Sequence, residues 1–114
     1  MFDQNIPIVE LTEGAIEKVR EYLQGGNYAG VRLTVHRKSG EFVYHFDYVE
    51  KGKADPKDST VGCGDYIFFI QYESVSVVRG AVIDYFQTGL TQAWVIDNPN
   101  SAWDSELARE YSYF

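Results

Sequence analysis

The stretch GVRLTVHRKSGEFVYHFDYV, Gly30–Val49, has a two-residue hydrophobic period that predicts a β-hairpin around its Ser-Gly turn. A turn of even length sets Leu33 opposite Phe46 and Arg32 opposite Asp47. A turn of odd length would instead set an apolar residue against a histidine. The even register is therefore favoured, and it gives the hairpin one apolar face and one polar face.

A helix is predicted before this hairpin, in the segment LTEGAIEKVREYLQGG. Thr12 is a suitable N-cap, and Gly25-Gly26 ends the helix. Ile16, Val19 and Leu23 recur at helical spacing and form one apolar stripe. The sequence thus predicts a single N-terminal helix with one face toward a core.

Further elements are expected after the hairpin. Lys51–Thr60 is polar and contains a proline, which is typical of a loop. Gly64–Tyr72 is an almost continuous apolar run, as expected for a central strand covered on both faces. The segment 73–80 favours a single helical turn ending at a glycine, and AVIDYF (81–86) and LTQAWVID (90–97) are two more expected strands.

Length and charge narrow the possible functions. A chain of 114 residues is expected to form one domain, residues 1–114, with a single hydrophobic core. Its net charge of −7 disfavours binding to nucleic acid or to an anionic membrane surface. We find no apolar run long enough to span a bilayer and no secretion signal, and a single cysteine allows no internal disulfide. We therefore expect a soluble, cytoplasmic, acidic protein.

The order of these elements and several short motifs resemble a known family. The matching segments are LTEGAIEKV, GVRLTV, SGEFVYHF, Ser74, Gly80, IDYFQTGL (Ile83–Leu90) and DNPN (Asp97–Asn100). Together they resemble the HesB-like, or A-type (IscA-like), domain of iron–sulfur cluster biosynthesis, over essentially the whole chain. The resemblance implies an α+β fold: a compact β-rich domain with one N-terminal helix packed on small mixed β-sheets.

The resemblance also implies three cysteine ligands, and this chain lacks all of them. The family's first cysteine lies in the hairpin turn, where Lys38 stands here. Its other two form a Cys-Gly-Cys motif after Asn-Pro-Asn, and no cysteine follows Asn100. Iron–sulfur clusters need thiolates, and a lysine ammonium has no free lone pair. We therefore expect neither an iron–sulfur cluster nor any other cofactor.

Three other groups of residues could carry chemistry. His36 and His45 are diagonal neighbours on the polar face of the predicted hairpin, so they could hold a metal ion with Asp47 or Glu41, or could simply be solvated. Cys63, between two glycines, could be a third weak metal ligand or a reactive thiol, or a small core residue.

Asp84-Tyr85 could suggest acid–base chemistry, although tyrosines also favour strands. The sequence contains no catalytic triad, phosphate loop, nucleotide fingerprint or paired-carboxylate motif, and it predicts a protein that is not an enzyme.

The C-terminal tail could form a short helix. Ser101 begins a possible short helix in which Trp103, Leu107 and Tyr111 recur every four residues; an extended tail is the alternative. The leading hypothesis is a HesB-like protein without the cluster ligands that acts through contact with a partner protein or a second copy. The alternative is a binder of iron or another metal.

Overall fold

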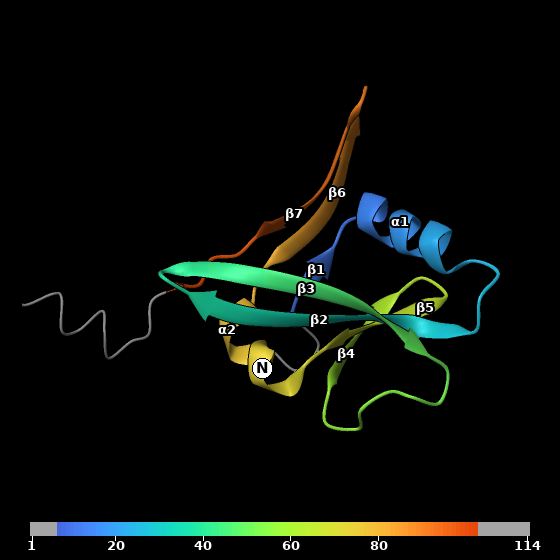
Figure 1. Ribbon diagram of the computed structural model, residues 1–114, viewed down its shortest axis with the longest axis horizontal. Helices are drawn as coiled ribbons and strands as arrows, with labels where there is room; N and C mark the ends of the chain where they lie inside the picture. Colours follow the sequence, from blue (N-terminus) through green and yellow to red (C-terminus); the bar gives the residue numbers. More distant parts are fainter. Residues whose placement is uncertain (1–6, 103–114) are drawn as a thin grey trace, which may run out of the picture.

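The computed structural model describes residues 7–102. These residues form two α-helices and seven strands, and Figure 1 shows how they are arranged. In chain order they are β1 (Glu10–Leu11), α1 (Glu13–Leu23), β2 (Tyr28–Lys38), β3 (Glu41–Glu50), β4 (Ser59–Cys63), β5 (Tyr66–Ile70), α2 (Val75–Val78), β6 (Val82–Thr88) and β7 (Thr91–Asp97). A 3-10 turn, Tyr72–Ser74, leads into α2.

The strands form two small sheets, each with parallel and antiparallel neighbours. One sheet has the order β3-β2-β5-β4, and its β2 and β5 are parallel. The other has the order β1-β6-β7, and its β1 and β6 are parallel. Figure 1 shows α1 beside the β6–β7 hairpin, which rises away from the larger sheet. The predicted α+β class with small mixed sheets is confirmed.

The hairpin has the predicted register. Leu33 lies opposite Phe46, and Arg32 lies opposite Asp47. The turn residues Ser39 and Gly40 have φ of 53° and 79°, the left-handed conformation that a tight two-residue hairpin turn requires. Leu33 is fully buried, so the face predicted to be apolar does lie toward the core.

The helix α1 begins where the sequence predicts. The Thr12 side chain accepts a hydrogen bond from the Ala15 N–H at 3.2 Å and donates one to Asp84 Oδ1 at 2.6 Å. The second bond joins the helix N-terminus to β6, and next to it β1 pairs with the start of that strand. The pairing of β1 was not predicted, because two residues carry no recognisable period.

Two predictions between the hairpins need correction. The polar loop ends earlier than predicted, because β4 begins at Ser59 and pairs with β5. The five residues of β4 are too few and too polar to show a strand in the sequence. The strand β5 is central, as predicted, but its two faces are not both covered, since Ile67 is 40% exposed while Phe68 is fully buried.

The turn before α2 completes the hydrogen bonding of β2 where β5 ends. Ile70 is the last residue of β5 that pairs with β2. Beyond it the Gln71 N–H donates to Leu33 O at 3.0 Å, and the buried Ser74 hydroxyl accepts from the Val35 N–H at 2.8 Å. The predicted helical turn therefore has a structural task, which is to satisfy a buried strand amide.

The polar loop is attached to the larger sheet through an ion pair. Arg32 donates from Nε and Nη2 to the two carboxylate oxygens of Asp58, at 2.6 and 3.0 Å. The Asp58 side chain is 1% exposed, whereas that of Arg32 is 30% exposed. Arg32 lies opposite Asp47, as predicted, but its ion pair is formed with Asp58 of the loop.

The core lies where α1, the two sheets and α2 meet. Its buried members come from every one of these elements: Val9, Ala15, Val19, Leu23, Val31, Leu33, Val35, Cys63, Phe68, Ile70, Val77, Val78, Ala81 and Ile83. Within residues 7–102, no helix combines the length and the apolar character that crossing a bilayer requires.

Candidate functional site

The turn between β2 and β3 is the position where the resemblance would place the first cysteine ligand. Lys38 ends β2 and pairs with Glu41 across the turn. Arg37, Lys38 and Glu41 are all exposed, and the structure shows no ion pair for either cation within the described residues. The turn thus presents two positive charges to solvent.

The Asn-Pro-Asn segment after β7 is fixed close to this hairpin. Asn98 Nδ2 donates to the Tyr44 hydroxyl at 3.1 Å and to the Val77 carbonyl at 2.9 Å. Asn100 Nδ2 donates to the Arg79 carbonyl at 2.9 Å, while its backbone N–H donates to Asn98 Oδ1. The two asparagines therefore bind β3 and the C-terminal end of α2.

Cys63, the single cysteine of the chain, lies away from this site. It is 1% exposed, and its neighbour Gly64 lies against α1, since a Cβ added there would meet Ile16 Cγ2 at 3.2 Å. The β4–β5 turn adjoins the start of β2, where Ile67 pairs with Gly30. From Gly30 to Lys38 an extended strand covers about 25 Å, so the thiol cannot reach the hairpin turn.

Burial also controls the chemistry of this thiol. Removal from water raises the pKa of Cys63 to about 11, because the thiolate loses its hydration. A thiol with such a pKa is protonated at neutral pH and is a poor nucleophile and a poor metal ligand. Of the three interpretations of Cys63, the structure supports the small core residue.

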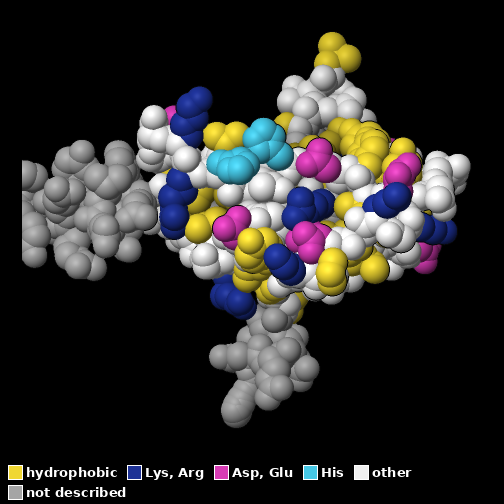
Figure 2. All heavy atoms as spheres, turned by 60° about the horizontal axis from the view of Figure 1, so that its bottom comes forward, with side chains coloured by type: hydrophobic (Ala, Val, Ile, Leu, Met, Phe, Trp, Pro, Cys, Tyr) yellow, Lys and Arg dark blue, Asp and Glu magenta, His cyan; other side chains and the backbone are white. Residues whose placement is uncertain are grey.

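His36 and His45 are neighbours, as the hairpin register predicted. Their ring centroids lie 5.4 Å apart, with the ring planes at 71°. Figure 2 shows both imidazoles together on the open surface. However, residues 7–102 contain no group of three or more His, Cys, Asp and Glu side chains arranged to hold a metal ion. Asp47 and Glu41 therefore do not complete a site.

Asp84 and Tyr85 are engaged in structural contacts. Asp84 Oδ1 accepts hydrogen bonds from the Thr12 hydroxyl at 2.6 Å and from the Tyr85 N–H at 2.8 Å. The Tyr85 hydroxyl bonds Gln92 Oε1 at 2.7 Å, and its ring packs against Trp94. These contacts join β6 to α1 and to β7, and they account for both residues without catalysis.

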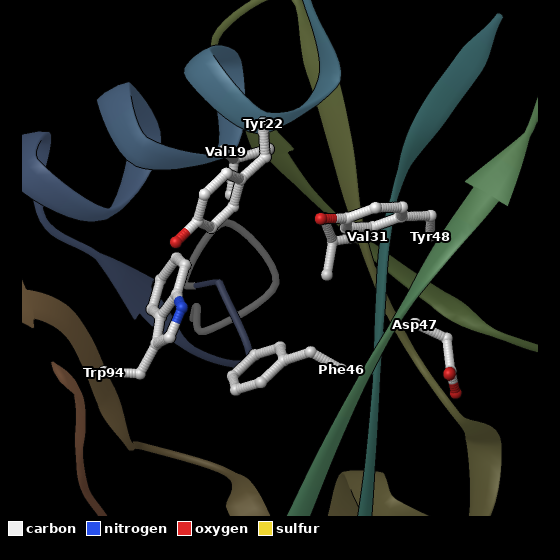
Figure 3. Close-up of a pocket in the computed structure, with 7 residues that line it drawn as sticks. All are labelled: Val19, Tyr22, Val31, Phe46, Asp47, Tyr48 and Trp94. Carbon is white, nitrogen blue, oxygen red and sulfur yellow. The ribbon is translucent and has the colours of Figure 1, made fainter. Parts of the chain in front are cut away.

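An aromatic cleft lies between α1, β3 and β7, and no sequence pattern predicted it. Figure 3 shows Tyr22 pointing toward Trp94, with Phe46 and Tyr48 on the other side and the Asp47 carboxylate directed away. The cleft encloses about 690 Å³. Phe46 and Trp94 stack with ring centroids 5.2 Å apart, so they hold the two sheets together at its floor. Its lining is suited to packing rather than to acid–base chemistry.

The tail prediction falls outside the described residues. Trp103, Leu107 and Tyr111, which carry the expected apolar stripe, belong to that part of the chain. The helix beginning at Ser101 and the extended alternative both remain predictions.

Comparison with known proteins supports the resemblance through structure. No family model matches the chain, and no curated protein matches it by sequence. Among solved structures, SufA of Escherichia coli, involved in biosynthesis of iron–sulfur clusters, is similar with a TM-score of 0.70 and 25% identity, over 84% of this chain and 86% of that one. IscA with a [2Fe-2S] cluster gives a TM-score of 0.65 and 27% identity, over 80% and 85%.

A third structure, a protein from Aquifex aeolicus solved by NMR, gives a TM-score of 0.58 and 22% identity over 81% and 92%, and it supports the fold alone. The resemblance drawn from the sequence is confirmed. The chain has the HesB-like, A-type fold of iron–sulfur cluster biosynthesis proteins, in a form without the cysteine ligands that the resemblance implies.

Proposed function

We propose that this chain is a non-enzymatic HesB-like protein that acts through protein–protein contact and does not carry an iron–sulfur cluster. One observation carries the proposal: the single cysteine is buried in the core, about 25 Å along β2 from the hairpin turn that bears Lys38. The position that would hold a thiolate in the family here presents a cation.

The donor set does not fit a cluster. A lysine ammonium cannot ligate iron, and the pKa of Cys63 is raised to about 11 by burial. Two copies of the chain would bring together at most two cysteines, whereas a cluster usually takes four protein ligands. We derive no cluster chemistry for this protein.

The hairpin turn suits contact with a negatively charged protein surface. Arg37 and Lys38 are exposed at its tip, and the Asn-Pro-Asn segment is hydrogen-bonded to Tyr44 and to the C-terminal end of α2. The chain has a net charge of −7, and these two adjacent cations form no ion pair within residues 7–102. They form a local positive patch that an acidic partner can recognise.

Two measurements test the absence of a cluster and the contact at the hairpin turn. The first is anaerobic reconstitution of the purified protein with ferrous iron and sulfide, with the Cys63→Ser variant as the matched control. We expect no visible absorption beyond that of the control and no protein-bound sulfide. Bound iron and sulfide in equal amounts that disappear in Cys63→Ser would show that this thiol ligates a cluster.

The second measurement tests contact at the hairpin turn. A photo-crosslinking amino acid at position 38, in the native host, should give one dominant adduct whose site is mapped by mass spectrometry. The same group at Lys53, on an exposed loop elsewhere, is the control. Arg37→Glu/Lys38→Glu should abolish binding to the identified partner. Identical adducts from both positions would contradict the proposed surface.

Metal binding at His36 and His45 is a second candidate function. It is favoured by the 5.4 Å separation of the two imidazole centroids on an exposed face. Neutral imidazole is the commonest protein ligand of transition metals, and two histidines with water can hold one ion weakly.

Calorimetric titration with Zn²⁺ tests this candidate directly. One ion per chain, lost equally in His36→Ala and His45→Ala, would support a two-histidine site. Thr34→Ala is the matched control, because Thr34 lies on the same face, opposite His45 and two residues before His36. Binding that persists in both histidine variants would exclude the pair as the site.

A further inference from the structure

The aromatic cleft between α1, β3 and β7 is large enough to hold a small molecule. It encloses about 690 Å³, which lies within the range of about 300–1,000 Å³ that is usual for small-molecule sites. Four of the seven residues that line it are aromatic, namely Tyr22, Phe46, Tyr48 and Trp94. Figure 3 shows these four rings around one open space, with the hydroxyl group of Tyr48 directed into it. The cleft therefore offers a ligand several aromatic rings at once.

The walls of the cleft are held in place by contacts within the protein. Phe46 and Trp94 stack at its floor, with ring centroids 5.2 Å apart. Tyr48 packs edge-to-face against Tyr28, with ring centroids 5.3 Å apart. At the same time Tyr22 and Tyr48 are 47% and 54% exposed. The rings are thus fixed in position and still accessible from solvent, as a preformed binding site requires.

The rings beside the cleft already attract one ammonium group. The Lys18 Nζ atom lies 5.4 Å from the ring centroid of Tyr22 and 4.6 Å from that of Tyr85, which are distances typical of cation–π contacts. Tyr85 in turn packs edge-to-face against Trp94. The Lys18 ammonium is also paired with the Glu21 carboxylate at 2.9 Å, so the lysine adds no net positive charge here.

The charge of the cleft favours a positively charged ligand. Asp47 is the one charged residue among the seven that line it. It lies opposite Arg32, but the Arg32 guanidinium is paired with Asp58, and no ion pair within residues 7–102 neutralises Asp47. Figure 3 shows the Asp47 carboxylate directed away from the rings, so it acts on a ligand through its electric field rather than by contact. The net charge of −7 on the whole chain adds to the attraction of cations and the repulsion of anions.

We propose that the aromatic cleft binds a small organic cation whose ammonium nitrogen carries methyl or other alkyl groups. Such a cation has few or no N–H groups to hydrogen-bond, and aromatic rings stabilise it through the negative charge of their faces. A primary ammonium is strongly hydrated and needs several acceptors, which a lining of mainly aromatic and aliphatic side chains does not supply. The volume of the cleft leaves room for the rest of the molecule beside the ammonium group.

Titration of the full chain with two small molecules of the same shape tests the proposal. One is choline, and the other is its neutral isostere, in which a tert-butyl group replaces the trimethylammonium group. Proton–nitrogen correlation spectra follow the Trp94 indole and the backbone amides of the cleft. We expect saturable binding of choline at one site per chain, about tenfold tighter than binding of the isostere, because the isostere gains no cation–π stabilisation. No saturable binding of choline, or equal affinity for the two molecules, would overturn the proposal.

Substitutions of the exposed rings locate the site. Tyr22→Leu and Tyr48→Leu should each weaken choline binding about fivefold or more, whereas Tyr22→Phe and Tyr48→Phe should retain it, because phenylalanine keeps the aromatic face. Tyr72→Leu is the matched control, since Tyr72 is 48% exposed and has the Lys57 ammonium 5.4 Å from its ring centroid, but does not line the cleft. The same spectra show whether each variant is folded.

A change at Asp47 separates the effect of charge from that of shape. Asp47→Asn should weaken choline binding about two- to threefold and leave binding of the neutral isostere unchanged, because only the cation responds to the lost carboxylate charge. Choline binding that both leucine variants leave intact, or chemical-shift changes that lie outside the cleft, would also overturn the proposal. None of the substituted residues lies in the hairpin turn, so these outcomes are independent of the proposed protein contact there.

Discussion

Replacing Arg32 by alanine tests the role of the ion pair that attaches the polar loop to the larger sheet. Arg32 and Asp58 make two hydrogen bonds, at 2.6 and 3.0 Å, and the Asp58 side chain is 1% exposed. The Arg32→Ala change leaves a carboxylate in a site that solvent hardly reaches. The affected quantity is the free energy of unfolding.

The magnitude follows from burial. Removing one partner of a buried ion pair costs about 3–5 kcal/mol. Because the Arg32 side chain is itself 30% exposed, water can enter its place and part of this cost is recovered. We therefore expect a loss of about 2–3 kcal/mol, equivalent to a fall in Tm of about 10–15 °C for a chain of this size.

Urea unfolding followed by circular dichroism measures this loss, and two variants serve as controls. Arg37→Ala, on the same strand, should stay within about 0.5 kcal/mol of the wild type, because Arg37 forms no ion pair among the residues that the structure describes. The double variant Arg32→Ala/Asp58→Ala should be more stable than Arg32→Ala alone, because it removes the stranded charge. A loss below about 0.5 kcal/mol for Arg32→Ala, as a solvated strand residue would give, would refute the reasoning.

The other predictions concern the core and the backbone. Leu33→Ala should cost about 2–5 kcal/mol in urea unfolding because the side chain is fully buried, and a loss below 1 kcal/mol would contradict this packing. Gly30→Ala should cost about 3 kcal/mol or more, since its Cβ would lie 1.7 Å from a carbonyl oxygen of β5; an unchanged unfolding midpoint would mean that the strands lie further apart. Ser74→Ala should cost about 1–3 kcal/mol by leaving a buried strand N–H without an acceptor, with Ser76→Ala as the control. Burial raises the pKa of Cys63 from 9.0 to about 11, so the protonated thiol favours the folded state, and stability should fall as pH rises from 9 toward 11; the fall should be smaller in Cys63→Ser, and equal pH profiles would contradict it.

Much of the fold could be predicted because its signals are local. The two-residue period and the turn parity gave the register of β2 and β3, and Thr12 with the glycine pair gave the bounds of α1. β1 and β4 could not be predicted, since they are short and depend on strands far away in the sequence. A local hydrophobic pattern does not show which distant strand a short segment pairs with.

Some features of the candidate site could also be predicted from local sequence patterns, and others could not. Lys38 at the hairpin turn, and the proximity of His36 and His45, followed from the register. The partner of Arg32 did not, because Asp58 lies on a loop whose path has no sequence period. Nor did the aromatic cleft, which exists only because two sheets and a helix meet there.

The bond between Thr12 and Asp84 has a consequence for how the chain folds during its synthesis. The residue that begins the first helix donates to a residue 72 positions later, and β1 pairs with the strand that contains it. While the ribosome is still making the middle of the protein, the first helix therefore has neither its final hydrogen bond nor its neighbouring strand. Contacts of such large sequence separation form late and slow folding. The N-terminal part of this protein reaches its final place among the last, although it leaves the ribosome first.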